Sequence, residues 1–238
     1  MLKEFVEKIL DLGKPEIVNL NCIDYSSRPL CMVVPPKLFS GIELHTLQGL
    51  ADAITVKVDK LNPEQFVLIV HSHAGVSLVK SGTDLHGRRE VLVNVNLSDG
   101  EIFPFNKFIP REEFVIGLQS RFVQDVVTGD LLRLTSALES SVVALAEDDG
   151  ISQRTTVKQG VALKEQVTVK GRRSLRPYRT FREIDQPASE FVFRLRSVGG
   201  EVPQCALFEA DGGKWKLDAV LEIKKWIEQK NLGVPIVA

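Results

Sequence analysis

The first forty residues show one helical hydrophobic pattern followed by shorter strand-like patterns. Between residues 2 and 12 an apolar side chain recurs every three or four positions, and Gly13 and Pro15 follow as stop signals. We therefore expect an amphipathic helix over 2–12. Residues 16–23 and 30–34 favour strands, and a pair of prolines ends this section because proline cannot donate to a sheet ladder.

The next segment has the pattern of a helix followed by a small antiparallel sheet. Thr46 has the hydroxyl of a helix N-cap, and it precedes an apolar stripe that runs to about Ile54. Residues 66–71 and 76–80 are apolar runs on the two sides of a turn, and residues 90–97 alternate between apolar and polar side chains. The pattern predicts a meander of about three antiparallel strands.

Two helices are expected between residues 110 and 147. Pro110 suits a helix N-terminus, where its missing N–H is no loss, and two acidic residues follow it. Thr128 or Asp130 can cap the second helix. The apolar faces consist of Phe114, Val115, Leu118, Phe122 and Val123 in the first helix and of Leu131, Leu134, Leu138 and Val142 in the second. The run Glu147-Asp148-Asp149-Gly150 then breaks the helical pattern with turn chemistry.

Beyond residue 150 the hydrophobic period changes to two. Strand-like runs cover 155–157, 161–163, 167–169, 179–184, 190–195 and 204–209, and a last helical pattern covers 217–227. The predicted fold class is α+β, with a small antiparallel sheet and helices in the N-terminal half and a β-rich C-terminal half closed by a C-terminal helix. We place the division at 148–150, between a mixed α/β antiparallel-sheet domain over 1–147 and a β-rich basic domain over 151–238.

Composition places the chain among ordinary globular proteins. Of its 238 residues, 44% are hydrophobic and 26% are charged, and no apolar run reaches the roughly 18 residues that span a bilayer. The N-terminus lacks a basic region followed by an apolar block, so no secretion signal is expected. Cys22, Cys31 and Cys205 fit no zinc spacing. Reduced, buried thiols in a cytoplasmic protein are the interpretation we favour.

Charge is distributed unevenly along the chain. The formal net charge is -1, yet residues 152–196 hold eleven Lys and Arg residues against four acidic ones, which leaves the rest of the chain strongly acidic. Within this window the basic segment, Thr168–Arg182, contains no acid. Its cations are Lys170, Arg172, Arg173, Arg176, Arg179 and Arg182, with Tyr178 and Phe181 among them. We expect these cations to contact phosphate and the two aromatic rings to stack on unpaired bases. The alternatives are an electrostatic seam within the chain or between subunits, and plain solubility.

Other candidate sites are weaker. His71 and His73 could both reach one metal ion from a strand, but only Asp84 and His86 are near enough to join them. Asp148 and Asp149 precede a glycine and are better explained by a turn than by an acid pair. Neither a P-loop, a dinucleotide-binding glycine motif nor a nucleophile elbow is present. We therefore expect no catalytic residue, no metal and no cofactor, and the protein is predicted not to be an enzyme.

The order of elements resembles a known family. The helix Thr46–Ile54, the hairpin Phe66–Lys80, the strand Glu90–Leu97 and the helix at Glu112-Glu113-Phe114-Val115 occur in this order in an uncharacterised family of bacteriophage and prophage proteins typified by YfdQ. Further similar phrases are Asp148-Asp149-Gly150-Ile151-Ser152-Gln153, Tyr178-Arg179-Thr180-Phe181, Gln186-Pro187 and Phe191-Val192-Phe193-Arg194. The resemblance covers about residues 45–200. It implies a phage-encoded accessory protein in the cytoplasm of a bacterial host, and it supplies no activity or catalytic residues.

The first functional hypothesis combines these observations. It is a non-enzymatic phage accessory protein that binds a polyanion, either single-stranded nucleic acid or a nucleotide, through the basic segment. Single strands suit the sequence better than duplex, because no helix with a basic face is visible. The alternative is a self-assembling structural or anti-defence protein that binds a host component. A homo-oligomer and a host protein are thus further expected partners, and a membrane is not. A hydrolase that uses His71, His73 or the Asp148-Asp149 pair is a third hypothesis.

Overall fold

The computed structural model describes residues 2–20, 23–26, 41–58, 61–83, 87–98, 100, 102–136, 145–148, 152–159, 163–196 and 203–238. For residues 2, 12, 20, 23–24, 145–148, 152–159 and 163–170 it describes the backbone alone. The chain divides into two compact units, which we call the N-terminal unit (Met1–Ser40) and the main unit (Gly41–Ala238). None of the helices in the described ranges is long and apolar enough to cross a membrane.

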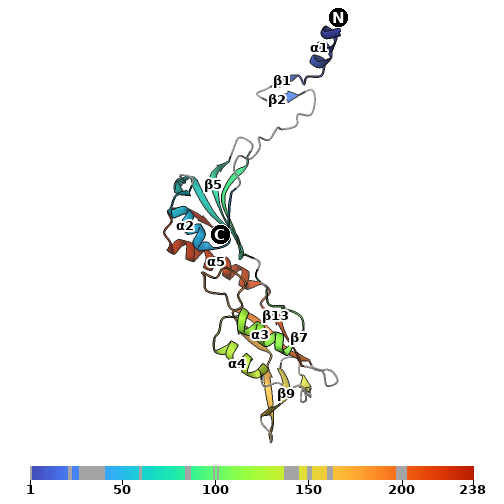
Figure 1. Ribbon diagram of the computed structural model, residues 1–238, viewed down its shortest axis with the longest axis vertical. Helices are drawn as coiled ribbons and strands as arrows, with labels where there is room; N and C mark the ends of the chain where they lie inside the picture. Colours follow the sequence, from blue (N-terminus) through green and yellow to red (C-terminus); the bar gives the residue numbers. More distant parts are fainter. Residues whose placement is uncertain are drawn as a thin grey trace. The chain divides into compact units, whose positions relative to one another are not determined.

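The N-terminal unit consists of one helix and one hairpin. Helix α1 (Leu2–Leu12) occupies the predicted range, and the backbone N–H of Gly13 closes its last turn on the carbonyls of Ile9 and Leu10. The single strand expected over 16–23 is instead a hairpin of β1 (Ile17–Leu20) and β2 (Ile23–Ser26) (Figure 1). The strand expected over 30–34 lies outside the described residues.

The first sheet of the main unit has five strands in the order β14-β4-β5-β6-β3. The predicted meander is confirmed as β4 (Phe66–Ser72), β5 (Gly75–Thr83) and β6 (Arg89–Asn96), which pair antiparallel. Two strands that the pattern did not indicate complete the edges in parallel, namely β3 (Ile42–Leu44) beside β6 and β14 (Ile236–Val237) beside β4.

Two helices cover one face of this sheet (Figure 1). Helix α2 (Leu47–Thr55) begins at the predicted cap, because the Thr46 hydroxyl accepts the N–H of Gly49 at 3.1 Å. A short 3-10 turn, η2 (Pro63–Gln65), leads into β4. Helix α5 (Lys214–Gln229) was expected to close the β-rich C-terminal half, but it packs on the first sheet. Its Ile223 and Ile227 share a core with Leu68, Leu78 and Val93 of the strands.

The second sheet has four antiparallel strands in the order β11-β12-β13-β7. They are β11 (Arg172–Leu175), β12 (Ser189–Arg196), β13 (Gln204–Glu209) and β7 (Ile109–Pro110). Helices α3 (Arg111–Arg121) and α4 (Val126–Ser136) cover one face with Phe114, Leu118 and Leu131. The predicted alternation in β12 is confirmed, since Phe191 and Phe193 are fully buried in this core.

A third sheet pairs β8 (Leu145–Asp148), β9 (Ser152–Gln159) and β10 (Leu163–Lys170) in the order β10-β9-β8. Both pairings are antiparallel, with Lys170 opposite Ser152 and Leu163 opposite Gln159. Two of the expected strands, 155–157 and 167–169, fall within β9 and β10.

Two local predictions are wrong. Arg179–Ile184 is not a strand but a series of turns. Phe181 and Ile184 are three residues apart, and both side chains enter the core between the first sheet and helices α2 and α5, which we call the first core. Helix α4 is capped neither by Thr128 nor by Asp130. Asp125 lies before the helix, and its Oδ1 accepts the N–H of Thr128 at 2.9 Å.

The observed α+β architecture confirms the predicted class, but the chain does not divide where the composition changes. The second sheet joins β7 from the first half of the chain to β11–β13 from the second, and the first sheet takes β14 from the C-terminus. A cut at 148–150 would therefore divide both sheets. The compact units separate at residue 40 instead.

Candidate functional site

The basic segment does not form one surface. Its described side chains lie in three places: the interior of the main unit, the side of the second sheet that carries α3 and α4, and the opposite side of that sheet. The side chain of Lys170, the first predicted phosphate contact, lies outside the described part of the chain. Each remaining residue can be assigned to one of these places from its partners and its exposure.

Arg179 lies in the interior. Its residue is 8% exposed, its Nη1 donates to the carboxylate of Glu209, and its Nη2 donates to the hydroxyl of Ser189. The guanidinium also stacks on Trp215, with 3.8 Å between Cζ and the ring centroid. Burial lowers the pKa of Arg179, while the charges of Glu209 and Asp211 oppose that shift. Arg179 therefore stabilises the junction between β12, β13 and α5, and it is not available to a phosphate.

Phe181 is also in the interior, with none of its surface exposed. The turn around it is held by hydrogen bonds. The hydroxyl of Thr180 donates to the carbonyl of His73, and Nε2 of the buried Gln186 donates to the carbonyl of Phe181 at 2.9 Å and to that of Ile184 at 3.2 Å. The phenyl ring belongs to the first core. A base cannot stack on a buried ring, so the prediction that Phe181 stacks on a base is wrong.

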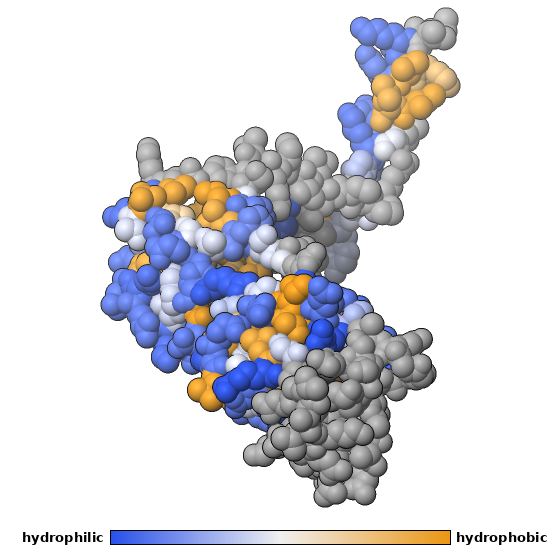
Figure 2. Space-filling view, turned by 60° about the horizontal axis from the view of Figure 1, so that its bottom comes forward, coloured by the Kyte–Doolittle hydropathy of each residue, from blue (hydrophilic) through white to orange (hydrophobic). Residues whose placement is uncertain are grey.

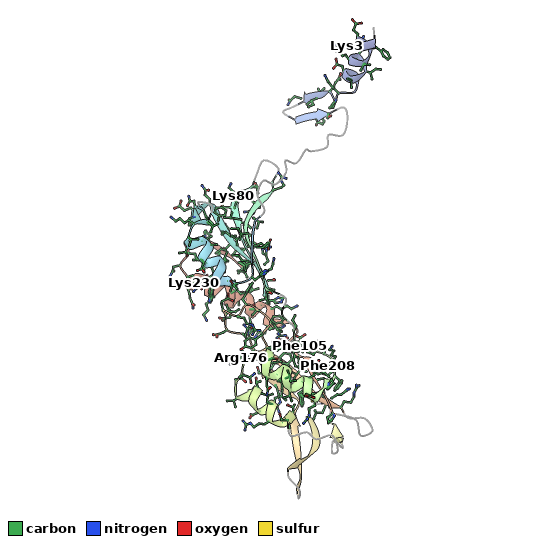
Figure 3. All side chains as sticks on the ribbon, in the orientation of Figure 1. Lys3, Lys80, Phe105, Arg176, Phe208 and Lys230 are labelled. Atoms are coloured by element: carbon green, nitrogen blue, oxygen red, sulfur yellow. The ribbon has the colours of Figure 1, made fainter. Side chains whose placement is uncertain are left out.

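On the helix side, Arg176 is engaged with α4 (Figure 3). Its Nε lies 3.4 Å from Oδ2 of Asp125, the capping residue. Burial by itself raises the pKa of Asp125, but hydrogen bonds from Thr128 and the charge of Arg176 outweigh burial and bring the pKa below its usual value. Arg176 thus acts in the packing of α4 on the sheet.

Arg173 and Arg182 have other surroundings than Arg176. Arg173 is half-buried, and burial lowers its pKa, against the opposing effect of Asp130. Its Nε is buried without a hydrogen-bond partner among the described residues. Arg182 is exposed and lies over the ring of Tyr178, with 3.8 Å between Cζ and the ring centroid. The guanidinium therefore occupies one face of the ring on which a base was expected to stack, and this pair is separate from Arg172.

Arg172 lies on the other side of the second sheet, which we call the outer face. Residues opposite one another in an antiparallel ladder share a face. Arg172 is opposite Val192, and Val192 is opposite Phe208, so the three form a row across β11, β12 and β13. Arg194 and Arg196 follow Val192 on the same face of β12, at intervals of about 6.8 Å. Arg172 and Arg196 are exposed, whereas Arg194 is half-buried.

Two aromatic rings lie among these arginines. Phe108, just before β7, meets Phe208 of β13 edge to face, with 5.8 Å between the ring centroids. The guanidinium of Arg196 lies 4.7 Å from the centroid of Phe108, and its Nη2 donates to Oε1 of Gln204 at 2.8 Å. The outer face thus carries arginines beside two half-buried aromatic rings, and Arg196 contacts both Phe108 and Gln204.

Sequence reasoning had found only part of this set. The period of two over 190–195 places Arg194 on the same face as Val192, and Arg196 continues that face, but both arginines lie outside the basic segment. Phe108 and Phe208 are a hundred residues apart, and only the pairing of β7 with β13 brings them together. No local pattern could have indicated that contact.

A pocket of about 410 Å³ between the loop before β12 and the start of α5 has the opposite charge. Its lining includes Asp185, Glu190, Asp211, Asp218 and Glu222, and Lys214 is the one cation in the lining. Asp211 helps to form the two-glycine turn before α5, since its Oδ1 accepts the N–H of Gly213 at 2.9 Å. An anionic ligand is disfavoured in this pocket by the surrounding carboxylates.

The histidine, cysteine and aspartate candidates have other surroundings. His71 is exposed, whereas the half-buried ring of His73 packs edge to face on Trp215, with 4.7 Å between centroids. The described residues include no cluster of three or more side chains suited to a metal ion. Burial raises the pKa of the Cys205 thiol to about 12. Asp84, His86, Asp149 and the side chain of Asp148 lie outside the described set.

Comparisons of the chain with protein-family models, with curated proteins and with solved structures found no match. The resemblance to a phage family accordingly stays a prediction. Function is therefore inferred from the geometry of the site alone.

Proposed function

We propose that this protein binds single-stranded nucleic acid on the outer face of its second sheet and that it does so without catalysing a reaction. The observation that carries the proposal is that one face of a sheet presents two exposed arginines, Arg172 and Arg196, beside two half-buried rings. Phe208 is the ring on which a base would stack, and Phe108 carries Arg196. The proposed phosphate contacts are therefore Arg172, which belongs to the basic segment, and Arg196, which does not.

The chemistry of such a face suits an unpaired strand. Arginine neutralises phosphates and donates to them in a planar, bidentate geometry. Aromatic rings stack on bases, which is worth about 1–3 kcal/mol per base and is possible only where the bases are not hidden in a duplex. A sheet presents both kinds of side chain at regular intervals, because alternate residues share a face. Duplex recognition would call for a basic helix that fits a groove, and α1–α5 provide none.

The distribution of charge favours phosphate at the outer face and not elsewhere on the main unit. The acidic pocket beside α5 repels phosphate, and the whole chain is close to neutral. Two exposed arginines predict a slope of about −1.4 for log affinity against log salt, so raising salt from about 50 mM to about 200 mM is expected to weaken binding about sevenfold.

The test is fluorescence anisotropy of the full chain with a labelled single-stranded oligonucleotide at these two salt concentrations. The double substitution Arg172→Glu with Arg196→Glu should abolish binding and its salt dependence. A matched control, Arg133→Glu with Lys225→Glu, changes the net charge equally at two exposed positions away from the outer face. The control should bind like the unchanged protein.

The stacking part of the proposal has its own test. Phe208→Leu keeps an apolar side chain on the outer face but removes the aromatic ring, so affinity should fall at least about fivefold, which corresponds to about 1 kcal/mol. Equal affinity of the outer-face and control charge variants, or tighter binding of a duplex of the same length, would show that the outer face is not the site. Capture of an acidic protein by this face, with no oligonucleotide binding at low salt, would favour the host-partner alternative.

A further inference from the structure

The apolar side chains that the structure describes in the N-terminal unit are all exposed. On α1, Phe5 is 64% exposed and Leu10 is 63% exposed, and Val6 and Ile9 share their face. The hairpin adds Ile17 at 61% and Tyr25 at 53%. Figure 2 shows these apolar side chains gathered on the unit at the N-terminal end of the chain. Of its described side chains, only Ser26 is even half-buried.

The described part of this unit has too little internal packing to be stable alone. Helix α1 has 11 residues, and isolated helices shorter than about 12–15 residues are marginal in water. The two-stranded hairpin is marginal as well, because neither a third strand nor a covering helix supports it among the residues that the structure describes in this unit. The unit is nevertheless a compact body separate from the main unit. A further surface is therefore needed to cover the apolar face of its described residues.

The charges of α1 indicate which surface this is. Lys3 and Glu7 follow one border of the apolar stripe, and Glu4 and Lys8 follow the other. When two copies of the helix pack antiparallel, each border meets the same border of the other copy in the opposite direction. Lys3 then faces Glu7 on one side, and Glu4 faces Lys8 on the other. The helix is thus complementary to itself in charge as well as in apolar surface.

A lipid surface fits less well. Helices that lie on membranes carry mainly Lys and Arg on their polar face, where they meet anionic lipid headgroups. The polar face of α1 has two lysines against Glu4, Glu7 and Asp11, and Asp11 also pairs with Lys14 at 2.6 Å. An acidic balance of this kind does not favour a membrane.

We infer that the N-terminal unit is a self-association arm, in which the apolar face of α1 packs on the same face of a second copy of this chain and the hairpin extends the contact. The arm forms its helix and hairpin as it associates. This inference does not depend on nucleic-acid binding, because no residue of the outer face belongs to the N-terminal unit.

The first experiment is sedimentation velocity of the full chain over a wide concentration range, with a monomer mass of 26.5 kDa as reference. Val6→Lys with Ile9→Lys should convert the protein to a monomer. The matched control, Asp11→Asn with Glu64→Gln, raises the net charge by the same amount at two exposed positions outside both borders of the apolar stripe and should leave association intact. Both tryptophans, Trp215 and Trp226, lie in α5, so their fluorescence reports whether the main unit stays folded in every variant.

A charge exchange tests self-complementarity directly. Lys3→Glu with Lys8→Glu, and separately Glu4→Lys with Glu7→Lys, should each weaken self-association at low salt, and an equimolar mixture should restore it as a heterodimer. A monomeric unchanged protein at every concentration overturns the inference, as does association that survives Val6→Lys with Ile9→Lys. If the main unit of the same chain covers α1, the unchanged protein is monomeric and the lysine variant lowers main-unit stability.

Discussion

Burial separates arginines that are neighbours in the sequence. Arg179 and Arg172 both belong to the basic segment, yet Arg179 is 8% exposed between Glu209 and Trp215, whereas Arg172 is exposed on β11. A buried guanidinium in this position has lost its water and depends on its partners. The same residue type therefore stabilises the fold at one position and is open to a ligand at another.

The difference can be measured as stability. Arg179→Met should lower the free energy of unfolding by about 3 kcal/mol, the lower end of the range for breaking a buried pair, because the side chain of Glu209 is 34% exposed. Arg172→Met should change it by less than about 0.5 kcal/mol, as an exposed residue. Urea unfolding followed by tryptophan fluorescence gives both values, and equal effects would contradict the assignment of Arg179 to the interior.

At the scale of single elements, α3 depends on a glycine for its approach to the neighbouring loop. A Cβ on Gly117 would lie 2.7 Å from Cε2 of Phe103. The ring of Phe103 is buried in the core between the second sheet and helices α3 and α4. Glycine within a helix normally costs about 0.5–1 kcal/mol relative to alanine. At this position the absence of a Cβ lets the helix and the aromatic ring pack closely, in spite of that cost.

Gly117→Ala should therefore destabilise the protein, in spite of the better helix propensity of alanine. Gly129 of α4 is the matched control, since a Cβ at that position would meet no atom within 4 Å, and Gly129→Ala should stabilise by about 0.5–1 kcal/mol. Thermal unfolding by circular dichroism distinguishes the two signs. Stabilisation by both substitutions would mean that Phe103 moves aside at little cost.

At the scale of the whole molecule, the main unit is one folding unit built from both halves of the chain. The first sheet needs β14 and α5 to cover β4, and the second sheet needs β7, α3 and α4 to cover β11–β13. Two separate fragments would each expose the apolar face of an incomplete sheet.

Fragments 1–147 and 151–238 should consequently fail to fold separately, whereas 41–238 should unfold cooperatively like the full chain. Dispersion of amide resonances and the sharpness of urea unfolding provide the measurement. Recovery of native tryptophan fluorescence on mixing the two fragments would support the interleaved arrangement. Independent, cooperative unfolding of either fragment would instead support the predicted domain boundary at 148–150.

Much of the local structure follows from the sequence, because its causes are local. The spacing of apolar residues determined α1 and the meander of β4, β5 and β6, and the hydroxyl of Thr46 determined the start of α2. The alternation in β12 identified which of its side chains are buried. These features require only the periods of helices and strands and the chemistry of caps.

Tertiary structure alone decided which surfaces exist. The basic segment has a uniform composition, but long-range pairing buries Arg179 and Phe181, engages Arg176 with Asp125 and leaves Arg172 exposed. The parallel edges β3 and β14 and the meeting of Phe108 with Phe208 also depend on strands far apart in the chain. A hydrophobic period specifies that a residue is buried, but not against which partner, and the candidate site depends on the partners.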